Sequence, residues 1–207
     1  MLEGYPMNPL NNHRHSLILG IVLAILLALG IGGTHFNQLG LARWFHIVSG
    51  VFWIGLLYYF NVAQTPAMAD AAADKGGPGG AGINKYVAPR ALFWFRWTAL
   101  ATWIGGAWLL GPKFVGAFTL GAGLDDPSHY YLTIGIGAWL GTIMLLNVWG
   151  VIWRMQKKIL GIVPATDEEK AKARRIALLA SRTNFVLSIP MLMCMASASH
   201  GLPFFKP

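Results

Sequence analysis

The feature that most constrains this sequence is a set of five apolar stretches, each nearly as long as a membrane-spanning helix. A helix needs about 20 predominantly apolar residues to cross the roughly 30 Å hydrocarbon core of a bilayer. The five stretches are residues 17–33, 41–61, 92–112, 130–153 and about 183–199. We therefore predict an all-α integral membrane bundle of about five transmembrane helices, with residues 1–207 forming a single transmembrane helical domain.

The amount and placement of charge support a membrane protein and exclude a nucleic-acid-binding one. Only 12% of the 207 residues are charged, whereas about 25% is usual in soluble domains. The net charge is +8, but the basic residues flank the apolar stretches and do not alternate with aromatic residues on one face. The expected partner is therefore the lipid bilayer, and no nucleic acid.

The distribution of lysine and arginine predicts the orientation in the membrane. If the amino terminus is inside, twelve of the 16 basic residues border the inner ends of the stretches, and only Arg43, Lys113 and Lys206 border the outer ends. Because basic residues are retained on the cytoplasmic side, we expect a cytoplasmic amino terminus and a periplasmic carboxyl terminus. The chain is thus predicted to be a multi-pass protein of the bacterial inner membrane.

Four of the six histidines fall on the outer side in this topology: His35, His46, His129 and His200. His46 lies inside the second apolar stretch, where a polar side chain must find a partner. Gly50, one turn further on, would let a flat macrocycle approach the helix. His46 and His200 stand at a similar depth, which is the arrangement that bis-imidazole ligation of haem b requires.

Two other interpretations of these histidines remain open. His46, His129 and His200 could together hold copper or another metal, or the histidines could simply occupy the headgroup region without a ligand. Arg96, inside the third stretch, also has two interpretations. No acidic residue lies in any of the five stretches to pair with it. Arg96 therefore either extends to the inner headgroups or pairs with a bound anion such as a haem propionate or a substrate.

The absence of several known catalytic motifs limits the reactions that this chain could catalyse. The sequence contains no P-loop, Rossmann glycine signature, HExxH zinc motif or nucleophile elbow. Its single cysteine, Cys194, cannot form an internal disulfide, and without a CxxCH stretch the chain cannot attach haem covalently. Whether the chain is an enzyme stays open, but an enzyme of this composition would use redox or metal chemistry.

Two segments carry a resemblance to a known family: residues 43–61, RWFHIVSGVFWIGLLYYFN, and residues 87–106, VAPRALFWFRWTALATWIGG. They resemble the membrane domain of PuuD-type urate hydroxylases, also described as the urate oxidase N-terminal domain family. The closing HGLPFF fits as well. The resemblance implies oxidation of urate to 5-hydroxyisourate with electrons passed to a cytochrome, and it places His46 and Arg96 within characteristic motifs.

In that family the membrane domain precedes a c-type cytochrome domain, which this sequence lacks. The leading hypothesis is therefore a membrane redox protein that passes electrons through an outer-face haem or metal site to a separate c-type cytochrome. One alternative is a non-catalytic, oligomeric or complex-bound subunit of a larger respiratory or photosynthetic assembly. Another is a copper-handling membrane protein.

Overall fold

The computed structural model describes residues 8–124 and 129–203, and all regular secondary structure in these residues is helical. The elements are η1 Pro9–Asn11, α1 His13–Ile31, α2 Gln38–Tyr58, η2 Tyr59–Gln64, α3 Thr65–Ala73, η3 Ile83–Val87, α4 Ala88–Leu110, η4 Gly111–Lys113, α5 Phe114–Phe118, α6 His129–Asn147, η5 Val148–Ile152, α7 Trp153–Ile159 and α8 Asp167–Ser197. The predicted all-α fold is confirmed.

Four helices among the described residues are long and apolar enough to cross a membrane: His13–Ile31, Gln38–Ala73, His129–Ile159 and Asp167–Ser197. Two of them are compound, because the π-helical turns η2 and η5 join α2 to α3 and α6 to α7 without a break. The third predicted span corresponds to α4, which has 23 residues but contains Arg96 and four tryptophans that lower its hydropathy. That α4 crosses the membrane stays a prediction.

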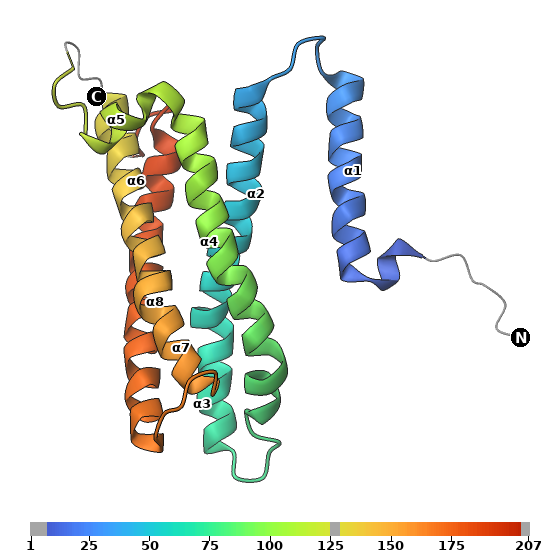
Figure 1. The fold of residues 1–207 in the computed structure, drawn as a ribbon, viewed down its shortest axis with the longest axis vertical. Helices are drawn as coiled ribbons and strands as arrows, with labels where there is room; N and C mark the ends of the chain where they lie inside the picture. The colour runs from blue at the N-terminus through green and yellow to red at the C-terminus, as the bar shows by residue number, and fades with distance from the viewer. Residues whose placement is uncertain (1–7, 125–128, 204–207) are drawn as a thin grey trace, which may run out of the picture. The chain divides into compact units, whose positions relative to one another are not determined.

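The chain divides into two compact units, residues 1–38 and residues 39–207. In the first unit, α1 is an apolar helix without a single buried residue. In the second unit, α2, α4, α6 and α8 run lengthwise as a bundle (Figure 1). A hydrophobic cluster that includes Leu57, Phe95 and Met144 forms the centre of this bundle.

Outside the hydrophobic centre, burial along α8 differs from that in a soluble protein. The inward face of α8 carries small and polar residues such as Ala177, Asn184 and Ser188, whereas large apolar residues such as Val186 (67% exposed) point outward. The same inversion places Gly137 of α6 against Cys194 of α8. Small residues at helix contacts with apolar residues outside are typical of helices that pack within lipid.

In the sequence, Thr166 and Glu169, three residues apart, predict a helix start from which a charged helix leads into the fifth span, and α8 begins there. The side chain of Thr166 accepts a hydrogen bond from the Glu169 backbone N–H (3.2 Å), and the Glu169 carboxylate accepts one from the Thr166 N–H (2.9 Å). This reciprocal pair is a capping box, which satisfies two backbone donors at the helix N-terminus. The charged segment then continues into the fifth predicted span as one helix of 31 residues.

Candidate functional site

His46 is the sequence-predicted residue with the best-defined surroundings. It lies eight residues after the start of α2, about 12 Å along the helix, and is half-buried. Its ring nitrogen Nδ1 lies 2.8 Å from the backbone carbonyl oxygen of Thr102 on α4. Because a carbonyl oxygen only accepts, Nδ1 must carry the proton and donate. In the neutral imidazole the other ring nitrogen, Nε2, then has a free lone pair and can ligate a metal.

Two glycines of α4 make room for this arrangement. A methyl group on Gly106 would lie 3.0 Å from Cε1 of His46, and one on Gly105 would lie 3.1 Å from Cα of His46 and 2.9 Å from the ring of Phe45. All three distances are shorter than an ordinary carbon–carbon contact of about 3.5–4.0 Å. The WIGG segment therefore lets α2 approach α4 closely enough for the imidazole to reach the Thr102 carbonyl.

Gly50 also contacts α4. A methyl group on this residue would lie 3.6 Å from Cγ2 of Thr102, which is an ordinary van der Waals distance. The glycine thus contributes to the contact between α2 and α4 one turn from His46. That it also leaves room for a macrocycle stays a prediction.

His200 is exposed, in the turn that follows α8. Its Nδ1 lies 3.3 Å from the backbone carbonyl oxygen of Ala196, a long but acceptable hydrogen bond. The same reasoning as for His46 places the proton on Nδ1 and leaves Nε2 free. Both histidines of the predicted pair therefore have the tautomer that ligates through Nε2, although shared ligation by His46 and His200 stays a prediction.

The structure does not place the other two histidines of the predicted outer set, His35 and His129, in a preformed cluster. His129 is the exposed first residue of α6, and His35 lies beside the hydroxyl of Thr34 at 3.2 Å. Within residues 8–124 and 129–203, no group of three or more His, Cys, Asp or Glu side chains could hold a metal ion. The structure therefore does not assemble His46, His129 and His200 into a three-ligand group.

Arg96 lies in an aromatic environment. Its guanidinium is 3.8 Å from the ring centroid of Trp153 and 5.4 Å from that of Phe93, distances typical of cation–π contacts. Trp153 is the first residue of α7. His46 contacts another part of α4, at Thr102, which lies six residues after Arg96 in that helix. Arg96 and His46 thus contact different parts of the bundle. Arg96 is held by aromatic faces and has no acidic partner within residues 8–124 and 129–203.

Sequence reasoning missed a buried cluster of amide side chains. Asn184 of α8 is fully buried; it donates to the Met144 carbonyl oxygen (3.0 Å) and accepts from Nδ2 of Asn147 (2.8 Å). Asn147 Nδ2 also donates to the Ala180 carbonyl oxygen (2.8 Å). Asparagines inside apolar stretches were a visible signal, because such side chains commonly hydrogen-bond across helices in membranes.

Asn61 extends this polar region to η2. It is 4% exposed, and its Nδ2 donates to the Leu57 carbonyl oxygen (2.8 Å) and to Oγ of Ser181 (2.9 Å). Its Oδ1 has no hydrogen-bond partner among the described residues. The π-helical turns η2 and η5 both pack against α8 in this region. The amide side chains therefore link three helices beside these two irregular turns.

Comparison with known proteins bears on the carboxyl-terminal part of the chain. Residues 128–207 match the family model described as urate oxidase N-terminal. The match confirms the resemblance to the urate oxidase N-terminal family, over less than half of the chain. Neither the curated proteins nor the solved structures gave a significant match.

The part matching the urate oxidase N-terminal family covers α6, η5, α7 and α8, and so includes His129, Asn147, Asn184 and His200. His46 and Arg96 lie outside it. The segments in which the sequence resemblance was densest, residues 43–61 and 87–106, are thus not the ones that the family model matches. His200 is the one residue of the predicted histidine pair inside the match.

Proposed function

We propose that this chain is a membrane oxidoreductase of the urate hydroxylase type, with His46 and His200 as imidazole ligands of haem b and a separate c-type cytochrome as electron acceptor. The observation that carries this proposal is the hydrogen bond from His46 Nδ1 to the Thr102 carbonyl oxygen, which fixes the ring and frees Nε2. The family match supports the urate hydroxylase part of the proposal.

The residues present fit an imidazole-ligated group. The ring of His46 is half-buried in an apolar region, and its hydrogen-bonded partner fixes both its tautomer and its orientation. Such outer hydrogen bonds raise the basicity of a histidine ligand and hold its ring in place. His200 supplies a second imidazole with the same tautomer, from the turn that follows α8. When bound, haem accepts and releases single electrons.

The electron balance explains why an external acceptor is required. Addition of water to urate to form 5-hydroxyisourate releases two electrons and two protons. The sequence has no CxxCH, no cysteine pair and no dinucleotide-binding motif that could retain both electrons. A c-type cytochrome that takes one electron at a time would remove them in two steps.

An assay of urate consumption tests the proposal. Membranes containing the protein should lose the ultraviolet absorption of urate only when an oxidised c-type cytochrome is added. His46→Ala should abolish this loss, while His13→Ala should leave it unchanged, since His13 is exposed in the other unit of the chain.

Two outcomes would contradict the proposal in different ways. Absence of cytochrome-dependent urate loss in the wild type would reject the urate hydroxylase function and favour a non-catalytic subunit of a larger complex. Equal urate loss in wild type and His46→Ala would retain the activity but remove His46 from the site.

A further inference from the structure

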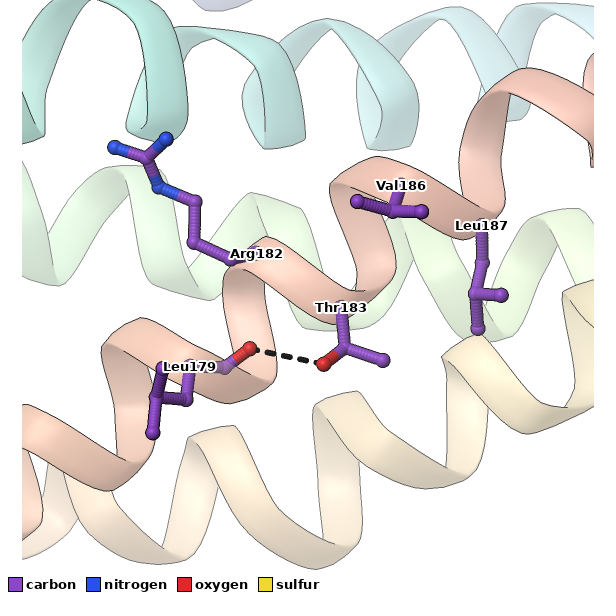
Figure 2. A pocket seen from close by; sticks show the side chains of 5 residues that line it. All are labelled: Leu179, Arg182, Thr183, Val186 and Leu187. Carbon is purple, nitrogen blue, oxygen red and sulfur yellow. Dashed lines mark hydrogen bonds between the residues drawn. The ribbon is translucent and has the colours of Figure 1, made fainter.

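A groove runs along the outward surface of α8. It is lined by Leu179, Arg182, Thr183, Val186 and Leu187 (Figure 2). These residues recur at intervals of three and four, so they share one side of the helix. Leu179 is 50% exposed and Val186 is 67% exposed, which places the groove on the surface that the bundle presents to its surroundings.

Arg182 supplies the polar character of the groove. The hydroxyl of Thr183 donates to the Leu179 carbonyl oxygen at 3.0 Å, so it is already engaged and its methyl group lines the groove. Arg182 is exposed and has no ion-pair or hydrogen-bond partner within residues 8–124 and 129–203. Figure 2 shows the guanidinium of Arg182 on one side of α8 and the side chains of Leu179 and Leu187 on the other.

The chain around Arg182 has a strong positive bias. Residues 154–182 contain eight basic residues and three acidic ones. Two of the acids are paired with lysines of the same segment, Lys158 with Glu169 at 3.2 Å and Lys170 with Asp167 at 3.6 Å. The segment as a whole therefore attracts anionic groups, and Arg182 is a basic member of this segment that lines the groove.

We propose that this groove binds an anionic glycerophospholipid. The phosphate contacts the guanidinium of Arg182, and an acyl chain lies along Leu179, Val186 and Leu187. A guanidinium has five donors in a fork that matches phosphate oxygens, and the apolar lining requires an apolar occupant. The net positive surroundings select a lipid with net negative charge over a zwitterionic lipid that carries the same phosphate.

Native mass spectrometry of the purified full-length chain in detergent tests this assignment, with phosphatidylglycerol and phosphatidylcholine as matched probes. The wild type should retain phosphatidylglycerol in preference to phosphatidylcholine. Arg182→Gln should weaken phosphatidylglycerol retention about fivefold, the equivalent of roughly 1 kcal/mol, because it removes the guanidinium that contacts the phosphate. Arg182→Lys should preserve most of the preference, because the charge remains.

Arg174→Gln is the matched control, since Arg174 is an exposed cation of the same helix that does not line the groove. It should bind phosphatidylglycerol like the wild type. The assignment is overturned if Arg182→Gln, folded by its thermal unfolding profile, retains phosphatidylglycerol like the wild type. It is equally overturned if Arg174→Gln loses as much binding as Arg182→Gln, because the attraction would then be a property of the whole basic segment.

Discussion

Gly106→Ala tests how the protein positions the imidazole of His46. The added methyl group would lie 3.0 Å from Cε1 and 3.2 Å from Nδ1 of His46, whereas uncrowded heavy atoms prefer about 3.5–4.0 Å. The ring must therefore withdraw by a few tenths of an ångström. Because its hydrogen bond to the Thr102 carbonyl oxygen is 2.8 Å long, such a shift lengthens the bond toward the usual limit of about 3.2 Å and weakens it.

Weakening of this hydrogen bond should cost at most about 0.5–1.5 kcal/mol of folding stability. It should also weaken ligation by His46, at most about 10- to 100-fold, the usual effect of removing an outer partner of a histidine ligand. Nitrogen NMR of labelled histidine reports the tautomer directly: His46 should be protonated on Nδ1 in the wild type and should become a mixture of tautomers in Gly106→Ala.

Gly55→Ala provides the control, because Gly55 lies on the same helix as His46 and a methyl group there meets no atom within 4 Å. This variant should keep the wild-type tautomer and stability. If Gly106→Ala also kept the wild-type nitrogen spectrum of His46 and the wild-type unfolding temperature, the proposed role of the glycine in seating the ring would be refuted.

Two further predictions concern packing and acid sensitivity. Gly135→Ala should destabilise the detergent-solubilised protein by about 1–3 kcal/mol, because the methyl group would meet the backbone of α5. The control is Gly141→Ala, whose methyl group would meet no atom within 4 Å. This variant should unfold at or above the wild-type temperature. The backbone N–H of Thr166, together with Lys158, lowers the pKa of Glu169 in the charged first turn of α8. A lowered carboxyl pKa stabilises the folded state above the unfolded pKa of about 4.3, and this stabilisation is lost as the pH falls through the folded pKa. The amide hydrogens at the start of α8 should therefore be less protected at low pH, relative to the intrinsic exchange rate at each pH, and Glu169→Gln should remove this change in protection.

The helices were predictable because each depends on its own stretch of sequence. The apolar stretch at residues 183–199 and the Thr166–Glu169 capping box together predicted a charged helix that continues into a span, and α8 has this form. By contrast, the second helix extends through η2 to Ala73, beyond the predicted end at residue 61. Its continuation is less apolar, and nothing in local composition marked a π-helical turn.

The surroundings of the candidate site could not be predicted, because they depend on how distant segments align. The bond between His46 and Thr102 joins residues 56 positions apart, and it forms only because Gly105 and Gly106 lie where α2 crosses α4. Likewise, Arg96 stacks on Trp153, a partner that hydropathy cannot identify. Sequence patterns therefore indicated which residues were costly to bury, and the packing of the bundle determined their partners.

The most direct test of the central claim, that His46 is an imidazole ligand of a redox group, is the reduced-minus-oxidised visible spectrum of the protein purified from a haem-replete host. The account predicts haem b bands in the wild type and in His13→Ala, and their loss in His46→Ala while that variant remains folded. A wild-type protein without haem bands, or a His46→Ala spectrum identical to the wild type, would contradict it.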